Sequence, residues 1–432
     1  MTVARAFGYV RYNPDEVDAG KVLAPPYDVI DEQERARLAA SDPYQSVLLE
    51  LPEGGDNKAA GELLRRWIED DVLELGEVGI AVVRQRYVGP DGVRRSRTGV
   101  VCEVGLHEFD EGKVLPHEQT FEAPRRVRLD LMRETGANIS PVFMVYHDPS
   151  RSLDDVVSSI TDDAPDFTSN EPNGNQAAVW FVTDPTLCEQ FEAIIEPHPL
   201  LIADGHHRYT AALAYREEAR AAGPKLSVVG GSAVGMAPYT STSGTDGVLA
   251  VVANSADDGI CVFPTHRVLR GTSLRQLDEF VLGSGAFRCD VHDDVEDAMF
   301  ALDQLKIPGF VVYHRDRVRL FSVPDASDLE IANPGTSDAY RSLDVVALHS
   351  LVIDGGALLG SSAEGVTYTR SLDEAVALVD EGDDRLGFLL RSADVESIHG
   401  VAQAGELLPQ KSTYFYPKVP TGIAFRLLNP LG

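Results

Sequence analysis

Apolar positions cluster along the chain in short runs that are typical of buried strands. Three such runs occupy residues 141–146, 178–182 and 200–203, and polar or helix-starting residues follow each of them. Runs of four to eight apolar residues match the length of strands that are covered on both faces. We therefore predict that these three segments belong to one central sheet.

Other segments carry the periodicity of hairpins and helices. Residues 80–106 are rich in Val, Tyr and Arg on both sides of the sequence Gly-Pro-Asp-Gly at 89–92, which predicts a hairpin. The remaining expected elements are a helix at 58–73, a hairpin at 309–323, a helix at 342–352 and a strand at 386–391. Alternation of strands and helices predicts a mixed α/β fold, of the α/β or α+β class.

A stretch rich in glycine and serine at 230–247 separates two parts of the chain. Such a composition is typical of a linker, and equally of a mobile lid beside an active site. We take it as the approximate boundary between a core at 1–255 and a smaller C-terminal α/β portion at 256–432.

The charge of the chain limits its partners. Its 432 residues contain 68 Asp and Glu against 38 Lys and Arg, a formal net charge of -30. The resulting field repels phosphate backbones and anionic lipid surfaces, so we expect neither a nucleic acid nor a membrane partner. A local cluster of cations and backbone N–H groups can still bind a small anion.

Cysteine usage and the N-terminus indicate a cytoplasmic protein. Four widely separated cysteines form no Cys-x-x-Cys pair, so neither a zinc site nor a redox motif is predicted. The first residues lack the apolar run of a secretory signal, and no segment approaches 18 consecutive apolar residues.

The most promising chemistry lies at Asp204-Gly205-His206-His207-Arg208. An apolar run precedes this motif and a helix-compatible run at 210–220 follows it, which predicts a strand, a tight turn and a helix. Gly205 permits a close approach, the helix start offers N–H groups, and Arg208 can fork onto phosphate oxygens. His206, His207 and Asp204 could exchange protons, and Asp204 could hold magnesium. A surface turn with polar caps accounts for the motif about equally well.

A second cluster brings His117 and Glu118 close to Arg125, Arg126 and Arg128. Glu118 could act as a general base toward a hydroxyl group, and the arginines could neutralise a phosphate. A solvated loop that leads into a helix at 129–134 is the competing interpretation.

Three further polar clusters are candidates, although each is more often a structural loop. Proline-fixed backbone accompanies hydrogen-bonding side chains in all three. Lys411, Ser412 and Thr413 resemble the chemistry of phosphate loops, but the glycines of a Walker A motif are missing. The other two clusters contain the pairs Tyr27 and Asp28, and His266 and Arg267.

Six blocks together resemble the bacterial family known as domain of unknown function 1015. In chain order they read PPYDVI (25–30), DPYQSV (42–47), PHEQT (116–120), ADGHHRYTAALAYR (203–216), PTHR (264–267) and PQKSTYFYPK (409–418). The family has an Asp-Arg pair after its PHExT block, whereas this chain has Val127 and Arg128. A carboxylate role at position 127 is therefore excluded.

The Asp-Gly-His-His-Arg block also resembles the turn of the ParB and sulfiredoxin-like superfamily, including its free-serine kinases. This resemblance implies a ParB/sulfiredoxin-like core whose residues Gly205 to Arg208 bind nucleotide phosphates. It also implies that Asp204 assists at the metal or the substrate hydroxyl, and that Glu118 is the base. Sulfiredoxins carry a nucleophilic cysteine where this chain has His206, so reduction of sulfinic acids is not expected.

We therefore predict a magnesium-dependent phosphotransferase that moves phosphate between a nucleotide, ATP or ADP, and a small hydroxylated metabolite such as free serine. Phosphoryl transfer to a small molecule requires mainly positioning of the reactants and neutralisation of the phosphate charge. Two alternatives stay open: a nucleotide-binding regulatory protein without turnover, and a phosphate-ester hydrolase. The sequence leaves the oligomeric state open. The prediction requires the blocks around Asp204, Glu118 and Lys411 to meet in one pocket, with His117, Arg128, Ser412 and Thr413 also on the phosphate.

Overall fold

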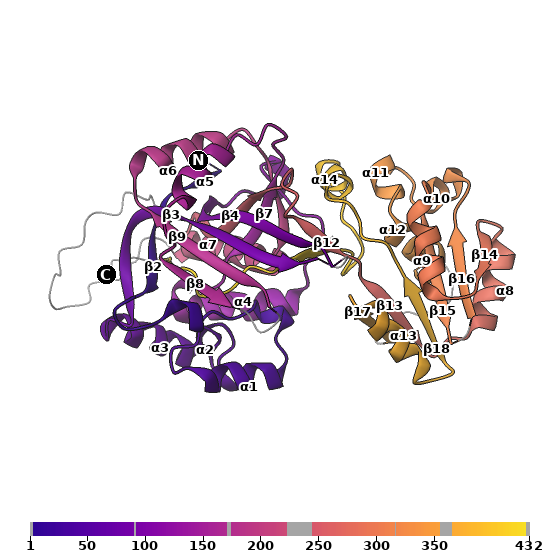
Figure 1. Ribbon diagram of the computed structural model, residues 1–432, viewed down its shortest axis with the longest axis horizontal. Coiled ribbons are helices and arrows are strands. Elements are labelled where there is room, and N and C mark those ends of the chain that lie inside the picture. Colours follow the sequence, from indigo (N-terminus) through magenta and orange to yellow (C-terminus); the bar gives the residue numbers. More distant parts are fainter. Residues whose placement is uncertain are drawn as a thin grey trace. The chain divides into compact units, whose positions relative to one another are not determined.

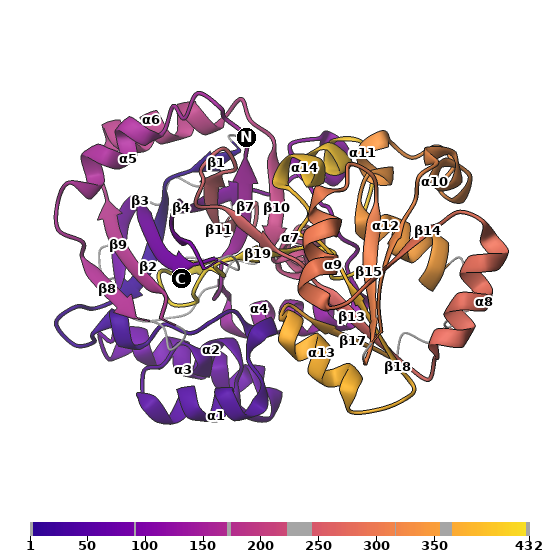
Figure 2. The ribbon, with the colours of Figure 1, turned by 45° about the vertical axis from the view of Figure 1, so that its right-hand side comes forward.

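A computed structural model describes residues 3–89, 92–170, 174–222, 244–315, 317–354 and 365–428. The chain forms two compact units, which Figures 1 and 2 show with their elements labelled. Unit 1 contains Met1–Leu115, Thr120–Cys261 and Pro417–Gly432, and unit 2 contains Pro116–Gln119 and Val262–Tyr416. The chain thus leaves unit 1 twice and returns to it at Pro417. Most of the expected linker, at 230–243, lies outside the described residues.

A mixed sheet forms the centre of unit 1. Among the described residues it has ten strands, ordered β5-β10-β7-β11-β4-β3-β9-β8, with β1 paired to β4 and β2 paired to β3. The strands are β1 (Ala4–Arg5), β2 (Phe7–Tyr12), β3 (Leu73–Val88), β4 (Arg94–Gly105), β5 (Val114–Leu115), β7 (Val142–Tyr146), β8 (Phe167–Asn170), β9 (Gln176–Val182), β10 (Leu200–Asp204) and β11 (Gly247–Asn254). The three predicted apolar strands, β7, β9 and β10, all belong to it.

Helices cover this sheet and bury its apolar side chains. Figures 1 and 2 show α5 and α6 on one side of the unit and α1, α2 and α3 on the opposite side. The helices are α1 (Glu32–Ser41), α2 (Val47–Glu50), α3 (Asn57–Glu69), α4 (Glu122–Thr135), α5 (Asp154–Thr161), α6 (Pro185–Ile195) and α7 (His206–Ala222), with short 3-10 turns η1 (Ala19–Lys21), η2 (Tyr27–Val29), η3 (Glu53–Gly55) and η4 (Phe109–Glu111). Helix α4 packs against both α3 and α7, which places the candidate site beside it.

The end of the chain is part of unit 1. Strand β20 (Arg426–Leu427) pairs with β6 (Ala137–Asn138), and Phe425 is completely buried against Val10 through a pair of backbone hydrogen bonds. The segment that follows Pro417 is thereby fixed next to the sheet.

Unit 2 contains a second sheet, whose described strand pairs are antiparallel. Its described strands follow the order β14-β16-β15-β18-β13-β17, and β12 pairs separately with β19. The elements are β12 (Cys261–Phe263), β13 (His266–Arg270), α8 (Leu274–Ser284), β14 (Arg288–His292), α9 (Val295–Gln304), β15 (Gly309–His314), β16 (Arg317–Ser322), α10 (Ala326–Ala332), α11 (Asp338–Arg341), α12 (Asp344–Leu348), the π-helix η5 (His349–Ile353), β17 (Val366–Thr369), α13 (Leu372–Asp380), β18 (Arg385–Leu389), α14 (Val395–Gln403) and β19 (Tyr414–Tyr416). Both units combine helices and strands, so the mixed α/β fold class is confirmed.

Most locally encoded elements agree with the sequence pattern. The two hairpins are β3 with β4 and β15 with β16, although residues 90 and 91 of the first turn lie outside the described residues. Helix α4 differs from its prediction because it begins at Glu122 instead of Leu129. Pro124 lies in its first turn, where proline removes no helical hydrogen bond. Among the described residues, no helix combines the length and the apolar character needed to cross a membrane.

Candidate functional site

The predicted strand, turn and helix around Gly205 are present in unit 1. Strand β10 ends at Asp204 and helix α7 begins at His206. Gly205 joins them with φ at +94°, and a Cβ atom there would lie 2.9 Å from Nε of Arg208. Only glycine satisfies both the backbone angle and the contact. Glycine has no side chain with which to cap the helix that follows it.

Asp204 is held between two cations. Its Oδ1 accepts a hydrogen bond from the ammonium group of Lys418, and its Oδ2 lies 2.5 Å from Nη2 of Arg208. All three side chains are nearly buried, with exposed fractions of 12%, 11% and 7%. Burial opposes ionisation of Asp204, but Lys418 and Arg208 outweigh it and lower the pKa to about 2. The carboxyl group is therefore a permanent anion.

Arg208 folds back over the turn from which it comes. Its Nη1 donates a hydrogen bond to the carbonyl of Pro141, and its Nη2 binds Asp204. Its buried Nε has no hydrogen-bond partner among the described residues. The guanidinium carbon lies 5.8 Å from the centre of the Tyr27 ring. One donor of the fork is thus uncommitted in the absence of a ligand.

A second buried arginine also contacts the ring of Tyr27. The guanidinium carbon of Arg128, from α4, is 4.0 Å from the ring centre, which is a close cation–π contact. Its Nη1 is 3.1 Å from Oε1 of the buried Glu50, which also accepts a hydrogen bond from Ser140 at 2.9 Å. Burial raises the pKa of Tyr27 to about 12, so its hydroxyl stays protonated. The two guanidinium groups fix the orientation of η2.

Asp28 follows Tyr27 and presents a carboxylate to the same cluster. Solvent reaches much of the residue. Even so, the surrounding protein disfavours its charge, and the nearby carboxylate of Asp204 adds repulsion; together they raise the pKa of Asp28. Lys418 and Arg208 act in the opposite direction but do not cancel this effect. Asp28 and Asp204 therefore form a pair of carboxyl groups with opposite pKa shifts, as acid–base sites often do.

His207 lies beside this carboxyl pair as a neutral imidazole. Its Nε2 is 3.1 Å from the backbone N–H of Phe121, so Nε2 accepts that hydrogen bond and the proton is on Nδ1. Burial is the main cause of its lowered pKa, against the opposing charge of Asp28. His206 is buried at the start of α7, within electrostatic reach of Asp204.

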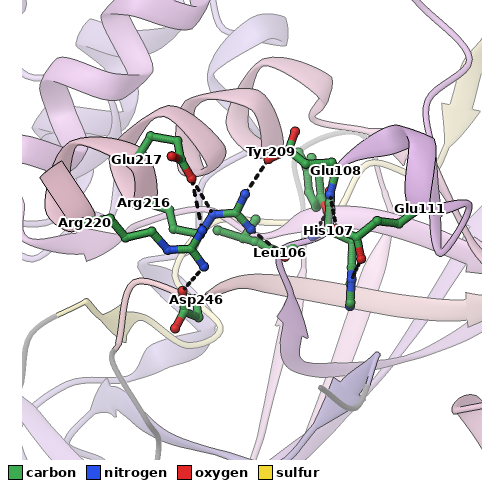
Figure 3. Close-up of polar contacts among 9 residues, drawn as sticks. All are labelled: Leu106, His107, Glu108, Glu111, Tyr209, Arg216, Glu217, Arg220 and Asp246. Carbon is green, nitrogen blue, oxygen red and sulfur yellow. Dashed lines mark hydrogen bonds and ion pairs between the residues drawn. The ribbon is translucent and has the colours of Figure 1, made fainter.

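A polar network attaches α7 to the loop after β4, as Figure 3 shows. The hydroxyl of Tyr209 accepts a hydrogen bond from the N–H of His107 and donates one to its carbonyl, both at 2.9 Å. About two turns further along the helix, Arg216 donates to the carbonyl of Leu106 at 2.7 Å and pairs with Glu108. The start of α7 is consequently fixed in position relative to the sheet.

The predicted His117 and Glu118 block lies in unit 2, where it contacts the predicted loop at 411–413. Nε2 of the fully buried His117 lies 2.7 Å from the hydroxyl of Thr413. Oε1 of Glu118 accepts hydrogen bonds from the N–H of Ser412 at 3.2 Å and from Thr413 at 3.4 Å. Two segments almost 300 residues apart thus come together within unit 2.

Arg267 and His266 belong to the same unit. Arg267 is completely buried and donates hydrogen bonds to the carbonyls of Thr265 and Lys411, the latter at 3.2 Å. Burial lowers its pKa to about 10. Burial and the charge of Arg267 also lower the pKa of His266 to about 4, and its Nδ1 accepts a hydrogen bond from the N–H of Leu390. These contacts fix the loop that carries Lys411.

The candidate residues therefore fall into two groups, one in each unit. Unit 1 brings together Tyr27, Asp28, Arg128, Asp204, Gly205, His206, His207 and Arg208. Unit 2 brings together His117, Glu118, Arg267, Ser412 and Thr413. The meeting of the two groups in one pocket stays a prediction.

Sequence reasoning missed two members of the first group. Lys418 is the last residue of the PQKSTYFYPK block but was not predicted as a site residue. Glu50 was not predicted either. Glu50 ends an apolar helix, α2, and is itself completely buried. A carboxylate in an otherwise apolar run is a signal that a buried cation lies nearby, here Arg128.

The described residues do not form a metal site by themselves. No group of three or more His, Cys, Asp or Glu side chains in the described part of the chain is arranged to hold a metal ion. Both oxygens of Asp204 already contact cations. The donors present do not fit a protein-only magnesium cage, and magnesium stays a prediction.

The fold and the two clusters define a mixed α/β protein with a glycine turn and a carboxyl pair in unit 1. The chain belongs to the family described as "Protein of unknown function (DUF1015)", whose model matches residues 4–346. The predicted family membership is thereby confirmed. A search of curated proteins gives no match.

Several solved structures resemble the chain at low identity. A conserved hypothetical protein from Pyrococcus furiosus is 14% identical, with a TM-score of 0.36 over 76% of this chain and 95% of that one. A free serine kinase in complex with AMP is 12% identical, with a TM-score of 0.35 over 75% and 92%. SbnI with a C-terminal truncation, from Staphylococcus aureus, is 12% identical, with a TM-score of 0.36 over 76% and 87%. Similarity at this level assigns neither a substrate nor an activity to this chain, and the ParB/sulfiredoxin-like core stays a prediction.

Proposed function

We propose that the turn from Asp204 to Arg208 binds the phosphate groups of a nucleotide and that the protein transfers a phosphoryl group to or from a small hydroxylated metabolite. The glycine turn at the start of α7 carries this proposal. Its N–H groups and the positive end of the helix dipole favour a phosphate, and Arg208 holds an uncommitted Nε at the same turn. Asp204 keeps Arg208 and Lys418 at that point.

Asp28 supplies the proton acceptor in this proposal. Phosphoryl transfer to a hydroxyl group needs a base near the nucleophile, and a carboxyl group with a raised pKa is better suited to it than one with a lowered pKa. The raised pKa of Asp28 contrasts with that of Asp204, which is too acidic to take a proton. Asp28 is also reached by solvent, as a residue that meets a substrate must be.

Glu118 is the other candidate base, and its assignment rests on the family resemblance. Its carboxylate already accepts hydrogen bonds from Ser412 and Thr413. These contacts favour a structural role for Glu118 in unit 2. Asp28 is therefore our first candidate for the base. Turnover measured in variants of Asp28 and of Glu118 distinguishes the two residues.

Nucleotide binding tests the first part of the proposal. The affinity of the full chain for ADP and ATP is measured by calorimetry with the wild type, Arg208→Lys and Arg208→Ala. Loss of a charge-assisted contact costs roughly 1.5 to 3 kcal/mol, so we expect Arg208→Ala to bind about tenfold or more weakly. Arg208→Lys keeps the charge but loses the fork, and an intermediate affinity is expected.

Arg37→Ala is the matched control, because Arg37 is exposed and pairs only with Glu34 on the surface of unit 1. Thermal unfolding of each variant shows that it is folded. Unchanged nucleotide affinity in folded Arg208→Ala would remove the phosphate-binding turn from the proposal. Turnover with ATP and a set of hydroxylated metabolites, free serine first, separates a phosphotransferase from a regulatory protein that only binds the nucleotide.

A further inference from the structure

Unit 2 contains a pocket of its own that the proposed function does not use. Its volume is about 320 Å³, within the range of small-molecule sites. It lies where β18 ends and α14 begins, and residues before α12 and beside β15 complete its wall. The polar lining residues used below are Thr265, Lys306, Asp344, Arg391, Ser392 and Ser412.

The opposite charges in the wall of this pocket neutralise each other. Arg391 binds both carboxylate oxygens of Asp344 through Nε and Nη2, each at 2.7 Å. Asp344 also accepts the N–H of Gly309 at 2.9 Å, and Arg391 donates to the carbonyls of Leu302 and Leu305. A bidentate pair with its remaining donors satisfied is a rigid part of the fold. Neither residue is available to attract a charged ligand.

Three other polar side chains in the lining have no hydrogen bond or ion pair with a described residue. Lys306 forms no ion pair with any described residue, and the hydroxyls of Thr265 and Ser392 make no hydrogen bond within the described part of the chain. Thr265 is 6% exposed, yet its hydroxyl is not closed off from solvent. A hydroxyl without a protein partner can donate to a water or to a ligand that enters the pocket.

The first turn of α14 also lies at this pocket. Asp394 and Ser397 line the pocket, so the N-terminal end of this nine-residue helix faces it. Asp394 caps the helix by accepting the N–H of Ser397 at 2.7 Å, so its carboxylate already interacts with the helix dipole. Lys306 and the hydroxyl donors are therefore the groups that favour an anion.

We propose that this pocket binds a small organic anion, with a phosphomonoester as the chemical class that fits it. Lys306 supplies the charge, and the hydroxyls of Thr265 and Ser392 donate hydrogen bonds to the oxyanion. Ser412 lines the same pocket, although its own hydroxyl donates to the carbonyl of Pro409. The site uses no residue of unit 1, and it does not depend on the proposed function.

Calorimetry with the full chain tests this site, with phenyl phosphate as the probe and phenol as its uncharged counterpart. We expect phenyl phosphate to bind and phenol to bind much more weakly. Lys306→Met and Thr265→Val should each reduce the affinity, Lys306→Met by about tenfold or more, and Lys306→Arg should restore part of it. Lys58→Met is the matched control, because Lys58 is an exposed lysine in unit 1.

Arg208→Ala separates this site from the nucleotide site, since it should leave the phenyl phosphate affinity of unit 2 unchanged. Lys306 is exposed and valine has nearly the shape of threonine, so both variants should fold, as thermal unfolding will show. The proposal is overturned if phenyl phosphate does not bind, or if it binds Lys306→Met and Thr265→Val as tightly as the wild type. Loss of binding only in Arg208→Ala would assign the probe to the turn in unit 1 instead.

Discussion

The ammonium group of Lys418 binds Oδ1 of Asp204 across 214 positions of sequence. The pair connects the last segment of the chain to the glycine turn, and it is nearly buried. Gln85 supports it from the sheet, because its side-chain amide donates to the backbone carbonyl of Lys418 at 2.9 Å. The geometry of the turn therefore depends on a residue that lies close to the C-terminal end.

Lys418→Met tests the energetic weight of this pair. Removal of one partner leaves the buried charge of Asp204 with Arg208 alone, and such losses typically cost roughly 3 kcal/mol or more. We expect a lower free energy of unfolding in urea. Lys21→Met is the control, since Lys21 pairs with Asp18 on an exposed surface and should change stability by less than about 1 kcal/mol. Equal losses of unfolding free energy in the two variants would show that the buried pair stabilises the protein no more than the exposed pair does.

Gly205→Ala tests the turn itself. A Cβ atom would strain the backbone at φ +94° and press against Arg208, so we expect a loss of roughly 1 to 3 kcal/mol and weaker nucleotide binding. Gly283→Ala provides the opposite control. Gly283 lies in α8 with open space around it, where alanine should stabilise the helix by roughly 0.5 to 1 kcal/mol. Denaturation and calorimetry on both variants provide the comparison.

Asp28→Asn should stabilise the protein near neutral pH. A carboxyl group with a raised folded-state pKa binds its proton more tightly in the folded chain than in the unfolded chain. The free energy of unfolding therefore falls as the pH rises from the unfolded-state pKa to the folded-state pKa of Asp28. Above the folded-state pKa, the whole destabilisation by the charged carboxylate is present. Asparagine removes this cost, whereas below the ordinary pKa of 3.8 both states are protonated and no cost exists.

The measurement is the unfolding free energy of wild type and Asp28→Asn near pH 7 and at about pH 3. We expect the variant to be more stable at the higher pH and the difference to shrink at the lower one. A variant that is less stable near pH 7 would mean that the cations Lys418 and Arg208 outweigh the repulsion from Asp204.

Local sequence signals were sufficient for the turn and the hairpins. The glycine between the apolar run of β10 and the helical run of α7 indicated the turn, because backbone freedom at Gly205 is a property of one residue. The β3–β4 hairpin was equally local, since its two strands are neighbours in sequence. Helix α4 was predicted too short because Pro124 reads as a helix breaker, although it is tolerated in the first turn.

Contacts between distant segments left no comparable signal. Lys418 and Asp204 meet only because the chain returns to unit 1 at Pro417, and no periodicity around Lys418 indicates its partner. The same holds for Glu50 and Arg128, which lie 78 positions apart on α2 and α4. The contact between His117 and Thr413 is equally distant in sequence, and both residues belong to blocks of the family resemblance.

The identity of the general base decides how the proposed reaction works, and two isosteric substitutions distinguish the candidates. Asp28→Asn and Glu118→Gln each remove a carboxylate while keeping its size. If Asp28 is the base, its variant should lose turnover by about 100-fold or more and keep its nucleotide affinity, since the phosphate contacts lie at Gly205 and Arg208. Glu118→Gln should then keep most of its turnover, because amide oxygens still accept hydrogen bonds from Ser412 and Thr413. The reverse ranking would assign the base to Glu118 and require the two units to act on one substrate.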